Sequence, residues 1–261
     1  MMRAVTLGTI RASSLLLLFV AVGCAAPATP PAATDPAAAG TTYVLHLPGV
    51  AGETSIDRWW LDALHQGGIG TKLEVYDWTC NDRGIDALHA TARNHVQAQL
   101  IASRITRQVR RHPSTHVILT AVSGGTGVAV WALERLPRDV VIDQVVLVAP
   151  AFAPDYDLSA ALRHVKGKAY AFTSPVDFIV LGFGTSVFGT IDGKYTEAAG
   201  FVGVQRPAHA DVTQYQKLIE LRYTPSWIRW GNLGDHTGAM SVAFAREYVA
   251  PLLEGRTLRE Q

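Results

Sequence analysis

Apolar residues recur along this chain with two different spacings, and their order predicts the secondary structure. Short apolar runs rich in β-branched residues predict strands over residues 42–47, 71–78, 117–119, 140–148, 168–173 and 222–230. Apolar residues three or four positions apart predict helices over residues 56–65, 81–112, 126–136 and 240–253. In the first helix, we expect Trp59, Trp60 and Leu64 to form the buried face. Because strands and helices alternate, the pattern predicts a mostly parallel central sheet with helices on both faces.

One stretch joins a predicted strand to a predicted helix through a turn of small residues. It reads H-V-I-L-T-A-V-S-G-G-T-G-V-A-V-W, with Ser123 at the turn. Ala121 and Gly125, two positions before and after the serine, are small enough for strand and helix to approach closely. This layout is typical of a nucleophile elbow, which presents a serine hydroxyl to solvent at the end of a strand. A glycine-rich phosphate-binding turn is the alternative, although no G-x-x-x-x-G-K-[ST] or G-x-G-x-x-G motif surrounds Ser123.

Acidic residues follow each of the two strands that are predicted after Ser123. Asp177 comes just after the predicted strand 168–173, in the sequence S-P-V-D-F. A carboxylate at the carboxyl end of a parallel strand is well placed to orient a histidine. A turn aspartate that only caps a backbone N–H is the alternative. Asp155 and Asp157, after the preceding strand, are competing acids, and we rank Asp177 first and Asp157 second.

His236 is the histidine best placed to act as a base. It lies in G-N-L-G-D-H-T-G, a loop of small residues before the closing helix, from which it can reach across the end of the sheet. A solvated loop histidine is the alternative. His46 in a strand, His164 after a helix and His209 in a polar loop compete less well.

Taken in chain order, these residues resemble those of the serine hydrolases with the α/β-hydrolase fold, in which serine, acid and histidine follow one another. The resemblance covers residues 42–253 and rests on A-V-S-G-G, S-P-V-D, G-D-H-T-G and L-P-G-V-A-G. It implies that Ser123 is the nucleophile and His236 the general base. Asp177 would then hold the imidazole in the required tautomer.

The resemblance also implies an oxyanion hole built from backbone N–H groups. One donor would be Gly124, at the start of the helix behind the serine. The other would be Val50, because P-G-V-A-G at residues 48–52 stands where the family has H-G-x-x-G. The chain departs from the family in lacking that His-Gly pair and in having Ala121 for the first glycine of the elbow. A plain turn between strand and helix is the alternative for this loop.

We expect a serine hydrolase, an esterase- or lipase-like enzyme that cleaves a carboxylic ester through an acyl-enzyme. A small-molecule or lipid-like ester is the expected substrate, and no cofactor is implied. A thioesterase or peptidase on the same fold is one alternative. A non-enzymatic binding or scaffold lipoprotein that retains the fold is another.

The mostly apolar segment F-I-V-L-G-F-G-T-S-V-F lies between the predicted acid and base. We expect residues 178–210 to form an insert that acts as a lid or as the wall of an acyl pocket. The alternative is that the apolar residues at its start are simply part of the core.

The first residues have the order of a bacterial lipoprotein signal peptide. Residues 1–23 contain two arginines, then an apolar run too short to span a membrane, and they lead to A-V-G-C. We therefore expect Cys24 to be lipidated and residues 24–41, rich in Ala and Pro, to form a disordered tether before a hydrolase domain over residues 42–261. Export and lipid anchoring in a bacterial cell envelope follow. An ordinary secretory signal, giving a soluble secreted or periplasmic protein, is the alternative.

Composition excludes several other classes of function. The chain of 261 residues has a net charge of +1 and shows no basic stripe or nucleic-acid recognition motif, so we expect no nucleic-acid partner. Cys24 and Cys80 are its two cysteines, so no disulfide framework is expected. His89, His95 and His112 lie along one predicted helix without metal-ligand spacing, and no metal is expected.

Overall fold

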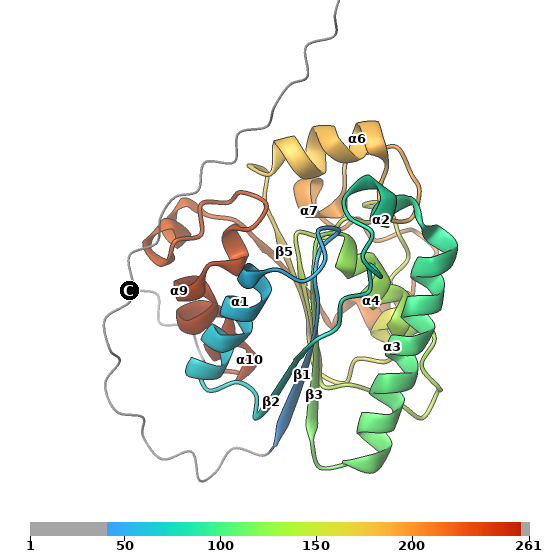
Figure 1. The fold of residues 1–261 in the computed structure, drawn as a ribbon, viewed down its shortest axis with the longest axis vertical. Helices are drawn as coiled ribbons and strands as arrows, with labels where there is room; N and C mark the ends of the chain where they lie inside the picture. The colour runs from blue at the N-terminus through green and yellow to red at the C-terminus, as the bar shows by residue number, and fades with distance from the viewer. Residues whose placement is uncertain (1–40, 257–261) are drawn as a thin grey trace, which may run out of the picture. The chain divides into compact units, whose positions relative to one another are not determined.

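The structure, a computed structural model, describes residues 41–256, which are coloured in Figure 1. The predicted signal peptide, Cys24 and almost all of the predicted tether lie outside the described residues. Within the described residues, no helix is both long enough and apolar enough to cross a membrane.

A parallel sheet forms the centre of the described domain. Within residues 41–256, its six strands are hydrogen-bonded in the order β2-β1-β3-β4-β5-β6, and each neighbouring pair is parallel. The strands are β1 Thr42–Leu47, β2 Lys72–Val75, β3 His116–Val122, β4 Gln144–Val148, β5 Ala169–Thr173 and β6 Leu218–Arg222. The predicted α/β architecture is therefore confirmed.

Helices cover both faces of this sheet (Figure 1). One face carries α3 Thr91–Arg111 and α4 Gly124–Glu134, and the other carries α1 Ser55–Gln66, α9 Val242–Phe244 and α10 Ala250–Leu253. The shorter helices are α2 Ile85–His89, α5 Ser159–Leu162, α6 Thr185–Phe188, α7 Ala199–Val202 and α8 Val212–Tyr215. Within residues 41–256, the remaining helical elements are two π-helical turns, η1 Phe178–Gly184 and η4 Ala245–Val249, and two 3-10 segments, η2 Pro225–Trp230 and η3 Gly238–Met240.

The alternation of side chains along the strands builds a separate core on each face. Leu45 and Leu119 pack into the core under α3 and α4, whereas their neighbours Val44 and Ile118 pack into the core that contains Trp60. Successive side chains of a strand point to opposite faces, so a strand covered on both sides must be apolar almost throughout. This explains why the central strands were recognisable as continuous apolar runs.

The prediction for the last strand is wrong. β6 ends at Arg222, and Pro225–Trp230 forms a 3-10 segment. Pro225 has no N–H to donate to a neighbouring strand, so an extended pairing is disfavoured there. The tight helical turn instead buries Trp227, whose ring packs against Phe172 and Phe244.

Three further predictions need correction in detail. The expected long helix is two helices, α2 and α3, separated by Ala90, whose backbone is not helical. Trp59 is 57% exposed, while Trp60 and Leu64 are buried, so Trp59 does not belong to the buried face of α1. The closing helix is interrupted, because η4 inserts a π-helical turn between α9 and α10.

Candidate active site

Ser123 lies at a strained turn between β3 and α4. Its φ of 53° and ψ of −131° fall in a region that residues with a side chain rarely adopt. The Ser123 N–H donates to the carbonyl of Val148 (2.9 Å), which ties the turn to the end of β4. This is the backbone conformation that the predicted elbow requires.

Glycine at position 125 lets a second loop approach the turn. A Cβ at Gly125 would lie 2.3 Å from the carbonyl oxygen of Pro48, so any larger residue would collide with the loop after β1. A Cβ at Gly49 would lie 3.3 Å from Cβ of Ser123. The loop therefore lies beside the serine, and Ser123 is only 8% exposed. The expectation that its hydroxyl points into open solvent is wrong.

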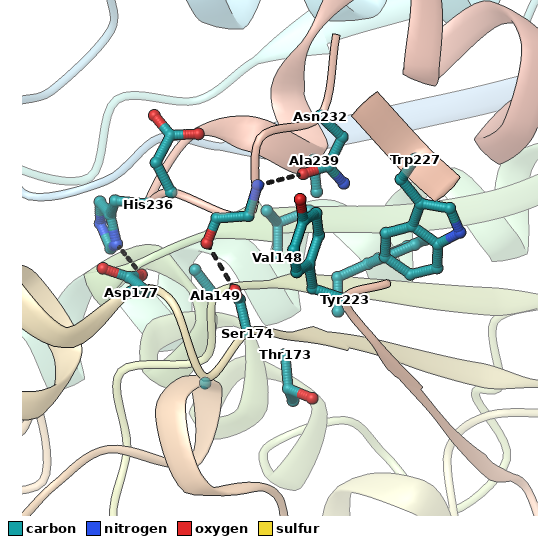
Figure 2. A pocket seen from close by; sticks show the side chains of 14 residues that line it. Val148, Ala149, Thr173, Ser174, Asp177, Tyr223, Trp227, Asn232, His236 and Ala239 are labelled. Carbon is teal, nitrogen blue, oxygen red and sulfur yellow. Dashed lines mark hydrogen bonds and ion pairs between the residues drawn. The ribbon is translucent and has the colours of Figure 1, made fainter. Parts of the chain in front are cut away.

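His236 joins Ser123 to Asp177. Its Nε2 lies 2.9 Å from Oγ of Ser123. Its Nδ1 lies 2.6 Å from Oδ2 of Asp177, the contact drawn as a dashed line in Figure 2. A carboxylate can only accept a hydrogen bond, so Nδ1 donates to Asp177, and Nε2 of a neutral ring is left to accept from the serine hydroxyl. Asp177 is buried, which keeps water from competing for this contact.

The loop that bears His236 is held by two polar side chains that were not predicted. The Ser174 hydroxyl donates to the carbonyl of Gly234, and the Gly234 N–H donates to Oδ1 of the buried Asn232 (2.9 Å), as Figure 2 shows. A Cβ at Gly238 would lie 2.4 Å from that same Oδ1. Asn in the G-N-L-G sequence is a usual turn residue, which was the only signal available in the sequence.

The competing acids have other partners. Asp157 accepts hydrogen bonds from the N–H (2.9 Å) and the hydroxyl (2.6 Å) of Ser159. Partial burial raises the pKa of Asp157, but these hydrogen bonds outweigh it and hold the pKa below its usual value. Asp155 pairs with Lys194 (2.8 Å) at the surface.

The two predicted oxyanion donors lie next to each other beside Ser123. A Cβ at Gly124 would lie 2.6 Å from Cγ1 of Val50, so only glycine fits where the two segments meet. Gly124 begins α4, and the first N–H groups of a helix have no acceptor within the helix. The Gly52 N–H donates to the carbonyl of Gly49 (3.0 Å), which closes the loop into a turn around Val50.

A cavity of about 250 Å³ opens beside Ser123 and His236. Apolar side chains from five segments line most of it: Val50, Ile56, Val122, Val180 and Met240. Ligand pockets of small molecules usually enclose about 300–1,000 Å³, so this cavity is slightly smaller than that range.

The apolar segment at the start of the predicted insert is largely exposed. In η1, Phe178 is 56% and Ile179 is 74% exposed, whereas Leu181 is buried and Val180 lines the cavity. The interpretation of this segment as ordinary core is therefore wrong for Phe178, Ile179 and Val180.

Cys80 and His164, also considered in the sequence, have no part in the arrangement around Ser123. Among residues 41–256, no three His, Cys, Asp or Glu side chains are grouped so that they could hold a metal ion. Cys80 is a free and exposed thiol. His164 is buried, and its Nδ1 donates to the carbonyl of Val140 (2.8 Å).

Solved structures resemble this fold, although the sequence comparisons found nothing. No protein-family model matches the sequence, and no curated protein matches it significantly. Lipase B of Aspergillus fumigatus aligns with a TM-score of 0.52 at 14% identity, over 86% of this chain and 55% of the lipase. This chain therefore spans little more than half the length of that lipase.

Together with the parallel sheet and the elbow, this likeness identifies the architecture. The chain has the α/β-hydrolase fold. Two further matches are weaker: the ydeN gene product of B. subtilis has a TM-score of 0.48 at 15% identity, over 83% of this chain and all (100%) of that protein. An acetylxylan esterase has a TM-score of 0.45 at 14% identity, over 82% of this chain and 96% of the esterase.

Proposed function

We propose that this protein is a serine hydrolase that cleaves carboxylic esters. The observation that supports this most strongly is the position of the His236 ring, which contacts Oγ of Ser123 on one side and Oδ2 of Asp177 on the other. A hydroxyl within hydrogen-bond reach of a base, which is itself oriented by a carboxylate, is the arrangement that activates a serine.

In the proposed reaction, Oγ of Ser123 attacks the carbonyl carbon of the ester while its proton passes to Nε2 of His236. The carbonyl π electrons move onto oxygen, and the N–H groups of Gly124 and Val50 bind the resulting oxyanion. The C–O bond then breaks, and His236 returns the proton to the departing alkoxide. Water attacks the acyl-enzyme through the same sequence and releases the carboxylic acid.

The cavity supports an ester with an apolar acyl group. Its lining is mostly apolar, which suits a hydrocarbon chain. A thioesterase or peptidase would use the same three residues, and the choice of leaving group separates these reactions. Lipase B, whose name records an ester-cleaving enzyme, shares the fold and is consistent with the ester.

Covalent labelling tests the enzyme against a binding or scaffold protein without knowledge of the substrate. A fluorophosphonate should attach to Ser123, and peptide mass spectrometry should locate the adduct there. The Ser123→Ala variant should neither be labelled nor hydrolyse p-nitrophenyl esters. Labelling that persists in this variant, or a wild-type protein that resists the probe, would contradict the proposal.

We also propose that the protein is anchored to a bacterial membrane by lipid on Cys24. This rests on the order of basic, apolar and small residues before that cysteine and on the Ala- and Pro-rich residues after it, all of which lie outside the described residues.

A further inference from the structure

A second array of carboxylate, imidazole and hydroxyl lies under the loop that follows β1. His46 donates from Nε2 to Oδ1 of Asp57 (3.0 Å), and its Nδ1 lies 2.9 Å from Oγ1 of Thr120. The His46 ring is 0% exposed, and Thr120 and Asp57 are also buried. No substrate can reach a ring sealed in this way, so His46 has no direct part in the reaction.

The array joins both ends of the loop that carries Val50. His46 stands in β1, two residues before the loop begins at Pro48. At the other end, Oδ2 of Asp57 accepts from the N–H and the hydroxyl of Thr54, both at 2.7 Å. Asp57 therefore hydrogen-bonds both to His46, just before the loop, and to Thr54, at its end.

The same array also links the loop to the strand that ends next to Ser123. Thr120 belongs to β3, three residues before Ser123, and pairs with His46 in the sheet. Asp57 lines the cavity beside Ser123, where its own oxygens are occupied by His46 and Thr54. The chain Thr120–His46–Asp57–Thr54 thus connects the strand that ends in the nucleophile with the loop that faces it.

Burial makes this connection stiff. A buried polar group without a hydrogen-bond partner is destabilised by its full desolvation free energy. Each member of the array therefore strongly favours the position in which it bonds to the next. The Trp60 ring packs beside the imidazole, with 5.2 Å between the ring centroids, and leaves it little freedom to tilt. Small displacements of the loop would break hydrogen bonds that water cannot replace.

We propose that Asp57, acting through His46 and Thr120, is a positioning residue that holds the Val50 N–H at the oxyanion; this rests on the proposed hydrolase function. The loop also has contacts from outside the array. Trp78 Nε1 donates to the carbonyl of Pro48 (2.7 Å), and the Gly84 N–H donates to that of Val50 (2.9 Å). The test must therefore decide whether the inner array adds to these contacts.

The experiment compares isosteric variants of the array with a matched buried histidine elsewhere. Asp57→Asn and Thr120→Val should each lower kcat about 10- to 100-fold with KM nearly unchanged, because loss of one oxyanion donor costs about 10²- to 10³-fold and a displaced donor costs part of that. The affinity for a boronic acid, which forms a tetrahedral adduct with Ser123, should weaken by a similar factor. Thr120→Ser, which keeps the hydroxyl, should restore most of the rate.

His164→Leu is the control, because it removes a buried histidine and its hydrogen bond to Val140 at a distance from the serine. It should lower the midpoint of unfolding and leave kcat unchanged. If Asp57→Asn and Thr120→Val are folded and keep the wild-type kcat and boronate affinity, the positioning role is overturned while fluorophosphonate labelling of Ser123 still supports the hydrolase. If wild-type Ser123 is not labelled at all, both proposals fail.

Discussion

The imidazole of His236 is contacted through both of its nitrogens, and in the proposed reaction each contact has a separate task. The serine side needs Nε2 free to accept a proton, and this requires the proton of the neutral ring to be on Nδ1. Asp177 enforces that tautomer because its oxygen lies 2.6 Å from Nδ1. Ser174 and Asn232 act one step further away, since they hold the loop backbone from which the ring projects.

We predict that Asp177→Asn disables the enzyme without unfolding it. An amide of the same shape can donate to Nδ1, which favours the wrong tautomer, and the corresponding change in a serine protease lowers kcat about 10⁴-fold. The measurement is kcat on one activated ester, with circular dichroism to check the fold. Asp157→Asn and Asp235→Asn are the controls and should stay close to wild type. A crippled Asp157→Asn beside a normal Asp177→Asn would mean that the acid is placed wrongly, although the hydrolase proposal would stand.

At the level of elements, the cavity is formed by segments that are distant in sequence. The loop after β1, the first turn of α1, η1 and η3 each contribute side chains to it. η1 follows Asp177 directly, and its Val180 lines the cavity.

We predict that Val180→Phe narrows the range of acyl groups whose esters the protein hydrolyses. The larger ring would occupy part of the cavity. We therefore expect kcat/KM for p-nitrophenyl octanoate to fall about tenfold or more relative to the acetate, because each methylene bound in an apolar pocket contributes about tenfold or more to kcat/KM. Val187→Phe, in the neighbouring α6 and similarly exposed, is the matched control and should leave the ratio unchanged. Equal ratios for the two variants would show that Val180 does not contact the acyl chain.

For the molecule as a whole, the buried Asp57 ties stability to pH. Burial by itself raises the pKa of this carboxyl, but His46 and Thr54 outweigh burial and hold its pKa below the usual 3.8. A carboxyl with a lower pKa in the folded state adds stability above its unfolded pKa, and this stability is lost as the pH falls through the folded value.

We therefore predict that wild type exceeds Asp57→Asn in free energy of unfolding at neutral pH and that this difference shrinks once the pH falls below about 4. Urea unfolding of both proteins across the acidic range measures it. A difference that stays constant or grows on acidification would show that the folded carboxyl does not have a depressed pKa.

We predict that the mature protein begins with a lipidated Cys24. Mass spectrometry of the amino-terminal peptide from membranes of a bacterial host should show the cysteine with added acyl mass, and Cys24→Ser should release the protein from the membrane fraction. A free Ala25 or Ala26 at the amino terminus would instead indicate an ordinary secreted protein.

Sequence by itself determined the order of the first five strands and the loops in which Ser123, Asp177 and His236 lie. Apolar periodicity and glycine placement are local properties, so β1 and the turn after β3 could be predicted from neighbouring residues alone. The residues that hold these loops, such as Asn232, were not recognised, because a polar turn residue has the same appearance whether it is exposed or buried.

Tertiary structure decided what depends on distance between segments. One example is whether Asp177 or Asp157 contacts the imidazole of His236, and another is whether His46 is solvated or buried against Asp57. Both depend on the order in which the parallel strands pair and on which helix covers them. The same holds for Pro225–Trp230, where burial of an aromatic ring prevailed over strand-like composition. Such outcomes follow from packing across the sheet, because the free energy of burying a ring or pairing a buried charge is set by neighbours far away in the chain.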